Sequence, residues 1–270
     1  MRLAVRHLTT YRYSRPVPYA IQSLRLTPRA WDGLAVIRWH VRGARSRPLA
    51  SFIDGLGNIV HTNSINLPHQ STTIIVEGTV ETRPTGGLVS GAPEPLPPLY
   101  FMRHTAMTAP DEAIRALADT ARGKQIIDRL MALMTLQAAR LRLSREAEDG
   151  AASAAQALAA GVGIARDHAH VFIAACRSLG VPARFVGGYV WPGPTGNERP
   201  ARHAWAEVYV DEIGWVGFDP AHVSQPTDAY IRVSIGLDYH AAAPVRGARR
   251  GEASETLAVS VDVSAAESAQ

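Results

Sequence analysis

The chain has 270 residues, of which 46% are hydrophobic, enough for the core of one large domain or two ordinary ones. The net charge is +4, and the 28 Lys and Arg residues are spread along the chain, so we expect no nucleic-acid partner. No apolar run approaches the roughly 20 residues that cross a bilayer, and a single cysteine excludes an internal disulfide framework, so we expect a cytoplasmic protein without a membrane partner.

Residues 1–83 contain short runs typical of β-strands. Several runs alternate polar and apolar residues with period two, and Gly, Pro, Asn and Asp separate them. The pair Gly57 and Asn58 is typical of a hairpin turn, because both residue types adopt the positive φ that tight turns require. The pattern predicts an N-terminal antiparallel β domain.

Residues 84–108 form a connector in this interpretation. The segment holds five prolines and three glycines, which disfavour a regular helix. Beyond it we expect an α+β core at 109–270. Asp111 lies near the start of a first helix, a second is expected at 124–143, and a third at 151–160 has Ser153 as a possible N-cap.

The next helix carries the most informative position. Gly161 and Gly163 break the preceding helix, and a new one is expected over 165–179, where Gly180 ends it. Ala165 therefore lies at a helix N-terminus. Free backbone N–H groups and the positive end of the helix dipole would lower the pKa of a thiol there and stabilise an oxyanion.

Three β-runs follow, at 183–191, 204–210 and 215–218. His203 precedes the second run, and Asp219 follows the third, sixteen residues later. If the second and third strands form an antiparallel hairpin, the start of one lies beside the end of the other. The sequence therefore predicts that His203 and Asp219 meet.

His168 and His170, together with His203, Asp219 and His222, are candidate ligands for a metal ion. Residues two apart on a helix point about 200° from each other, so His168 and His170 cannot ligate one ion from a regular helix. Asp167 and His170 could, but the chain contains no HExxH motif or second ligand cluster at helical spacing. We expect no metal and no cofactor.

The stretch Gly163-Ile164-Ala165-Arg166-Asp167, with His203-Ala-Trp and the later Gly-Trp-Val-Gly-Phe-Asp-Pro, resembles the core of the transglutaminase-like superfamily of papain-type thiol enzymes. Residues 1–83 resemble the β-rich N-terminal domain of its bacterial branch, and the C-terminal residues resemble its ending, a β extension of the core.

The resemblance implies an α+β fold in which a helix packs on an antiparallel sheet. It also implies acyl transfer from a peptide or glutamine amide through a Cys-His-Asp triad. By position, Ala165 takes the place of the nucleophile, His203 that of the base and Asp219 that of the orienting acid. Only the first departs from the family pattern.

No other residue is expected to replace the missing thiol. Cys176 lies about 16 Å further along the same helix at 1.5 Å per residue, and a buried core position suits it better. Ser153 precedes the glycine break, and Ser178 lies near the far end of the helix.

The sequence predicts the substrate cleft and the binding partner in less detail than the triad positions. Arg166, Asp167 and Trp205 are candidates for the substrate cleft or oxyanion site, and the Gly- and Pro-rich segment 191–200 is a candidate lid. The expected partner is a peptide or protein substrate.

Two functions stay open at this point. In one, the chain is a thiol peptidase, amidase or transglutaminase in which an introduced alanine removes the nucleophile. In the other, alanine is natural, and the protein is a pseudoenzyme that binds a peptide or protein through the retained cleft. The sequence does not distinguish hydrolysis from transamidation, and it does not determine the oligomeric state.

Overall fold

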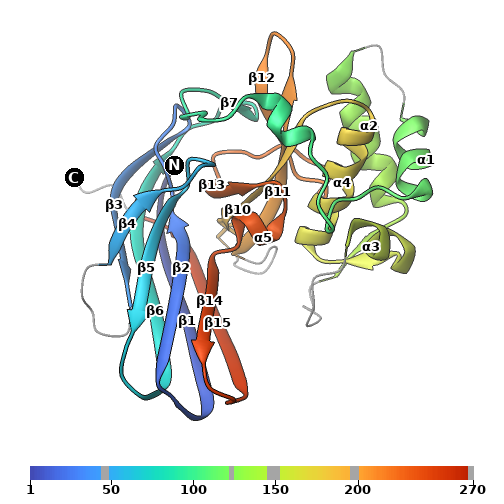
Figure 1. Ribbon diagram of the computed structural model, residues 1–270. Helices are drawn as coiled ribbons and strands as arrows, with labels where there is room; N and C mark the ends of the chain where they lie inside the picture. Colours follow the sequence, from blue (N-terminus) through green and yellow to red (C-terminus); the bar gives the residue numbers. More distant parts are fainter. Residues whose placement is uncertain (44–48, 122–124, 145–152, 195–200, 267–270) are drawn as a thin grey trace.

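The computed structural model describes residues 1–43, 49–121, 125–144, 153–194 and 201–266, and these form a β sandwich beside a mixed α and β core (Figure 1). The expected α+β class is confirmed, with antiparallel pairing throughout the large sheets. No helix in the described ranges is both long and apolar enough to cross a membrane.

The β sandwich consists of two four-stranded sheets. In spatial order, the first contains β15 (Glu255–Ala265), β1 (Arg2–Val17), β6 (His69–Thr82) and β3 (Leu34–Arg42). The second contains β14 (Val245–Arg250), β2 (Tyr19–Thr27), β5 (Ile59–Ile65) and β4 (Ala50–Ile53). Leu24 and Leu26 of β2 pack against Ile74 and Val76 of β6, so the alternating apolar residues of the two sheets form the sandwich core.

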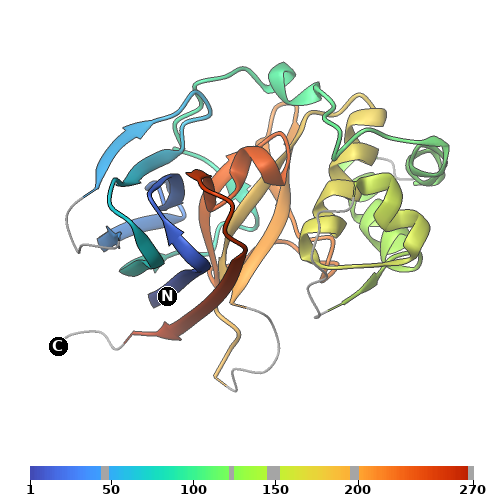
Figure 2. The same cartoon turned by 60° about the horizontal axis from the view of Figure 1, so that its bottom comes forward.

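The last two strands return to the N-terminal strands (Figure 2). β14 pairs with β2, and β15 pairs with β1 from Leu3 opposite Ala265 to Tyr13 opposite Glu255. The C-terminal β extension, expected as part of a core at 109–270, therefore completes the sandwich instead. The physical reason is that β1 and β2 each need a partner for one edge, and the partner comes from a distant part of the chain.

The connector is partly structured. β7 (Leu88–Val89) joins the edge of the core sheet beside β12 (Gly214–Phe218), and the 3₁₀-helix η1 (Pro98–Met102) follows. Between them, Glu94 forms an ion pair of 2.6 Å with the fully buried Arg184. The connector is thereby fixed to the core.

A helical layer covers one side of the core. Its members are α1 (Glu112–Thr120), α2 (Ile126–Ala138), α3 (Ala154–Ala160) and α4 (Ala165–Ser178). Asp111, which the sequence placed in the first turn of α1, is its N-cap. Ser153 is the N-cap of α3, as expected, and also forms a capping box with Gln156. The second helix ends earlier than expected, because residues of the expected 124–143 segment form β8 (Arg142–Leu143), which pairs in parallel with β9 (Val162–Gly163). Residues 124, 151 and 152 lie outside the described ranges.

The core sheet has the order β13 (Tyr230–Gly236), β10 (Ala183–Val190), β11 (Arg202–Val210), β12 and β7. Helix α4 packs on β10 and β11, where Ala204, Ala206 and Val208 present a small, flat surface to it. This is the predicted helix on an antiparallel sheet. The short helix α5 (Tyr239–Ala242) follows β13 and leads into the sandwich.

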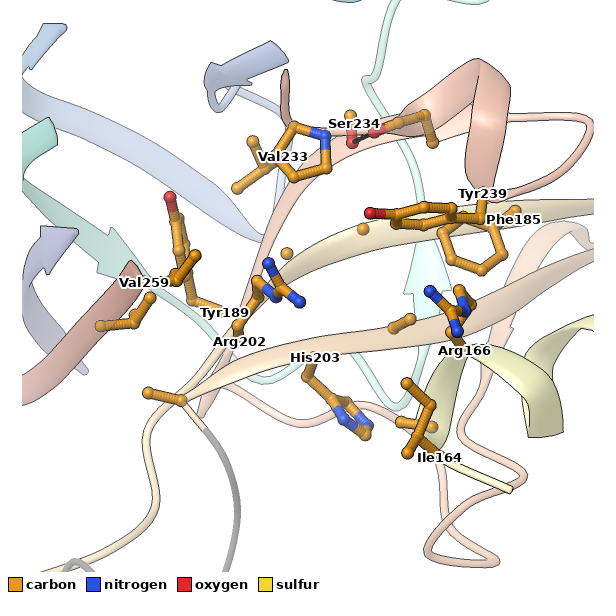
Figure 3. Close-up of a pocket in the computed structure, with 18 of the residues that line it drawn as sticks. Ile164, Arg166, Phe185, Tyr189, Arg202, His203, Val233, Ser234, Tyr239 and Val259 are labelled. Atoms are coloured by element: carbon orange, nitrogen blue, oxygen red, sulfur yellow. Dashed lines mark hydrogen bonds between the residues drawn. The ribbon is translucent and has the colours of Figure 1, made fainter. Parts of the chain in front are cut away.

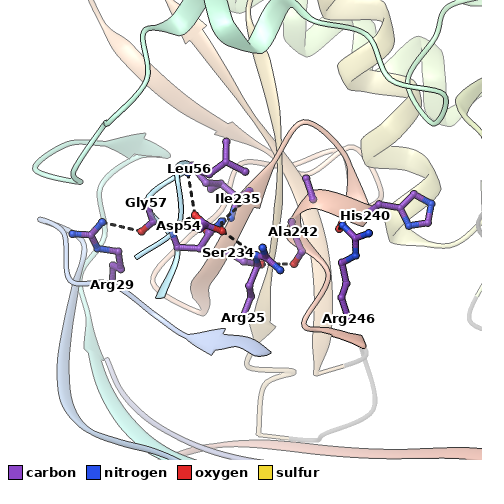
Figure 4. A network of polar contacts seen from close by, with 12 residues as sticks. Arg25, Arg29, Asp54, Leu56, Gly57, Ser234, Ile235, His240, Ala242 and Arg246 are labelled. Atoms are coloured by element: carbon purple, nitrogen blue, oxygen red, sulfur yellow. Dashed lines mark hydrogen bonds and ion pairs between the residues drawn. The ribbon is translucent and has the colours of Figure 1, made fainter. Parts of the chain in front are cut away.

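The turn between β4 and β5 contacts the core. The side-chain amide of Asn58 donates to the carbonyl of Ile235 at 2.9 Å and accepts from its N–H at 2.8 Å. Asp54 receives a hydrogen bond from Arg25 at 3.0 Å and closes the same turn (Figure 4). These contacts fix β13, whose Val233 and Ser234 line the cavity described next.

Candidate active site

Ala165 is the first residue of α4, and the chain reaches it in a fixed geometry. The N–H of Ile164, the N-cap residue, donates to a carboxylate oxygen of Asp167 at 3.0 Å. A Cβ on Gly163 would lie 2.9 Å from the Cβ of Asp167, so only glycine allows this close turn. As predicted, the methyl group of Ala165 stands at a helix N-terminus.

His203 and Asp219 meet as the hairpin register predicts. β11 and β12 pair with Ala206 opposite Phe218, and Nε2 of His203 lies 2.7 Å from Oδ2 of Asp219. Both side chains are buried, with exposures of 1% and 0%. Because Asp219 takes Nε2, Nδ1 is the ring nitrogen of His203 left for proton transfer.

Asp219 is surrounded by hydrogen-bond donors. Its Oδ2 also accepts from the hydroxyl of Tyr230 at 2.7 Å and lies 2.8 Å from Nδ1 of His222, while Oδ1 accepts from the N–H of Ala221 at 3.1 Å. Burial alone would raise the pKa of Asp219, but the hydrogen bonds from His203 and His222 outweigh burial and hold the pKa well below its usual range. The group is therefore a carboxylate at neutral pH.

Two aromatic side chains hold the imidazole of His203. Trp205 stacks beside it with ring centroids 6.3 Å apart and an interplanar angle of 23°. Tyr230 meets both rings edge-on. The imidazole is thus oriented by Asp219 at one end and by packing on its faces.

A cavity of about 470 Å³ opens beside these residues (Figure 3). Ala165 and His203 lie on its wall, and this volume falls in the usual range for small-ligand sites. Both parts of the molecule contribute: His7 of β1 and Val259 of β15 come from the sandwich, while Phe185 and Tyr239 come from the core. The cavity thus places the helix start and the histidine in reach of one ligand.

The expected cleft residues separate into two groups. Arg166 lines the cavity. Asp167 and Trp205 are buried behind the wall, which corrects their expected place in the cleft: Asp167 caps α4 and Trp205 packs beneath His203. Of the expected lid, residues 195–200 lie outside the described part of the chain.

The sequence did not indicate the contributions of Tyr230 and Arg202, and it favoured a core position for Tyr189. Tyr230 lies on β13, and no local motif shows that this strand passes under Asp219. Tyr189 and Arg202 face each other across β10 and β11 and line the cavity. For His222 the sequence suggested only a role as a metal ligand. Its position three residues after Asp219 was the sequence feature that could have indicated the contact between the two side chains.

The histidines considered for a metal site do not gather at one point. Within the described ranges only His203, Asp219 and His222 cluster, and their polar atoms are in direct hydrogen-bond contact. Nε2 of His170 instead accepts from the N–H of Tyr239 at 3.0 Å, and burial lowers the pKa of His170 to about 3. Burial also lowers the pKa of His168. Of the residues considered for a metal site, His203, Asp219 and His222 therefore come together.

The alternative nucleophiles are engaged elsewhere. Cys176 is fully buried, and burial raises its pKa far above the ordinary value of a thiol. The hydroxyl of Ser153 caps α3, and that of Ser178 donates to the carbonyl of Ala174 at 2.9 Å. Ser144, which the sequence did not single out, lies on the cavity wall.

Comparison with known proteins matches both parts of the chain. Residues 110–220 match the profile of the transglutaminase-like superfamily, and residues 3–81 match that of the bacterial transglutaminase-like N-terminal region. Two proteins described only as uncharacterized, from Mycobacterium leprae (strain TN) and Mycobacterium tuberculosis (strain H37Rv), are each 28% identical. The alignments cover 97% of this chain in both cases and 98% and 92% of those proteins, respectively.

One solved structure has the same fold along the whole chain. It is a protein from Cytophaga hutchinsonii described as a candidate cysteine protease, with a TM-score of 0.77 and 18% identity. The superposition covers 100% of this chain and 92% of that one. At this identity the likeness concerns the fold.

Proposed function

Because the chain belongs to the transglutaminase-like superfamily over residues 110–220 and carries the bacterial N-terminal region over residues 3–81, we propose that it has the site of a thiol acyl-transfer enzyme acting on peptide or glutamine amides. The observation that carries the proposal is the buried His203–Asp219 pair facing the same cavity as Ala165 at the start of α4. With alanine at 165, the chain binds its substrate and does not turn it over.

The proposed chemistry uses a cysteine at position 165. Its thiolate sulfur attacks the amide carbonyl carbon, and backbone N–H groups at the start of α4 stabilise the oxyanion. His203 takes the thiol proton on Nδ1 and returns it to the departing amine as the C–N bond breaks. Water or a second amine then attacks the thioester and releases the sulfur.

Asp219 has an orienting role in this proposal. As a carboxylate bonded to Nε2, it fixes the tautomer of His203 and stabilises the imidazolium that forms during proton transfer. Tyr230 and His222 keep the carboxylate ionised and in place, because both contact the same oxygen. They are positioning residues.

A second candidate function is a natural binding protein. The contacts of Asp219 with His203, His222 and Tyr230 are complete without a thiol, so the pair also serves as a structural element beside a retained cavity. In this case a peptide or protein partner occupies the cavity, and no acyl-enzyme forms. Ala165 itself is the observation that favours this alternative.

Substitution Ala165→Cys separates the two functions. We expect the Ala165→Cys chain to release amine from a library of peptide and glutamine amides, and Ala165→Ser to be much less active because a hydroxyl ionises far less readily. A second substitution, His203→Gln, should abolish the gained turnover. If Ala165→Cys turns over no member of the library while the unsubstituted chain binds some of them, the binding function is correct.

We also propose a cytoplasmic location and a peptide or protein partner. The location rests on Cys176, the only cysteine of the chain, which is a free thiol and suits a reducing compartment. Fractionation of cells that produce the protein tests this, and recovery from the periplasm would contradict it.

A further inference from the structure

The cavity beside Ala165 carries positive charge. Three arginines, Arg25, Arg166 and Arg202, lie on its wall, and no Asp or Glu occurs among the described residues that line it. The remaining wall is largely apolar, with Phe185 and Tyr189 among its members. Charges on an apolar wall act more strongly on a ligand than charges in water do. Which of these arginines acts on a ligand depends on whether its charge is already paired within the protein.

Arg25 is neutralised within the protein. Its Nε lies 3.0 Å from Oδ2 of Asp54, and both side chains are mostly buried. This pair belongs to the contact between the sandwich and the core (Figure 4). Arg25 therefore adds little net charge to the cavity.

Arg202 is different. It is exposed, and within the described part of the chain it forms no hydrogen bond or ion pair. It directly precedes His203 on β11, and the two side chains leave opposite faces of the strand (Figure 3). Its charge also acts on His7, another residue of the cavity wall: burial first, and Arg202 second, lower the pKa of His7 to about 4.

Arg166 directly follows Ala165 and is held in place. Its guanidinium lies 4.9 Å from the ring centroid of Tyr239, whose backbone N–H is fixed by His170. Its Nε lies 3.4 Å from Asp167, a carboxylate also engaged by the N-cap of α4. Figure 3 shows the side chains of Arg166 and Arg202 both reaching toward the cavity.

We propose that the cavity selects an amide substrate that carries a carboxylate. The carboxylate binds to Arg202 inside the cavity that Arg166 also lines. A guanidinium presents a planar fork of donors that matches a carboxylate, and the apolar wall accommodates the rest of the ligand. Arg166, Arg202, His203 and the nucleophile position all line this one cavity of about 470 Å³, so the carboxylate lies within one or two residues of the scissile amide. The word substrate rests on the proposed function, whereas binding of the carboxylate does not.

The carboxylate has two possible sources, an acidic side chain and a peptide C-terminus. Short acetylated peptides with a central glutamine separate them. In one pair of probes the following residue is Glu or Gln, with the C-terminus amidated in both. In the other pair the following residue is Ala, with a free or amidated C-terminus. Binding to the unsubstituted chain is measured by isothermal titration calorimetry, with no turnover to complicate it.

We expect at least one acid probe to bind at least about tenfold more tightly than its amide partner, the usual advantage of a charge-assisted hydrogen bond. Arg202→Gln should remove that preference, and Arg115→Gln should preserve it, because Arg115 is exposed on α1 away from the cavity. Equal binding of acid and amide forms, no binding of any probe, or an unchanged preference in Arg202→Gln would overturn the proposal.

The Ala165→Cys chain distinguishes this inference from the proposed function. If it turns over acid and amide probes equally well, the carboxylate preference is wrong and the acyl-transfer function stands. If acid probes bind through Arg202 but Ala165→Cys releases no amine from them, the acyl-transfer function fails and the carboxylate site stands.

Discussion

His7 links the stability of the protein to pH. Its ring nitrogens lie 2.8 Å from the hydroxyl of Tyr189 and 3.0 Å from that of Thr9, so it joins β1 to the core sheet. Burial, and then the charge of Arg202, lower its pKa from 6.5 to about 4. We predict that His7→Gln, which removes the titrating group and keeps hydrogen-bonding capacity, flattens the dependence of stability on pH.

The sign follows from proton binding. Between pH 6.5 and pH 4 the unfolded chain binds a proton at His7 and the folded chain does not. The contribution of His7 to the free energy of unfolding is therefore fully present above pH 6.5 and is lost as the pH falls toward 4. With these two pKa values, lowering pH from 7 to 5 costs about 2 kcal/mol of unfolding free energy through His7. His170, whose pKa is lowered to about 3, also lowers the free energy of unfolding as the pH falls, and His7→Gln does not remove this second loss.

The assay is urea unfolding at pH 7 and pH 5, followed by fluorescence. The loss of unfolding free energy between the two pH values should be about 2 kcal/mol smaller in His7→Gln than in the unsubstituted chain. His40→Gln, an exposed position on β3, controls for the loss of an imidazole. An equal loss in His7→Gln and the unsubstituted chain would refute the reasoning.

Three further predictions concern buried contacts. Glu207→Gln should cost about 3 to 5 kcal/mol in urea unfolding, because Glu207 accepts hydrogen bonds from two arginines in the core; a cost below about 1 kcal/mol would contradict this. Tyr230→Phe, introduced with the thiol at 165, should lower kcat about tenfold with little change in KM, since it removes a donor to Asp219; an unchanged kcat would count against it. Gly163→Ala should lower the Tm by several degrees through its clash with Asp167, and an unchanged Tm would show that the turn can relax.

Several features were predictable because they depend on local spacing. The meeting of His203 with Asp219 follows from the register of one short hairpin, and the cap at Ser153 follows from a serine placed directly before a helix. The alternation on β11, with Trp205 on one face and the alanines on the other, follows from the period of a strand.

Other features depend on contacts between distant segments. β15 pairs with β1 although more than 200 residues separate them, and the sequence of a strand does not show which distant strand will pair with its edge. Tyr230 reaches Asp219 only because β13 lies beside β10. The charge of the cavity likewise appears only when Arg166 and Arg202, which are remote in sequence, face one space.

The central claim is that position 165 is the seat of a nucleophile, and the thiol pKa of the Ala165→Cys chain tests it most directly. The pH dependence of alkylation measures this pKa, and Cys176 does not interfere because it is fully buried. We predict a pKa well below the ordinary value of about 8.5, returning toward it when His203→Gln is added. An ordinary pKa that does not respond to His203→Gln would contradict the account.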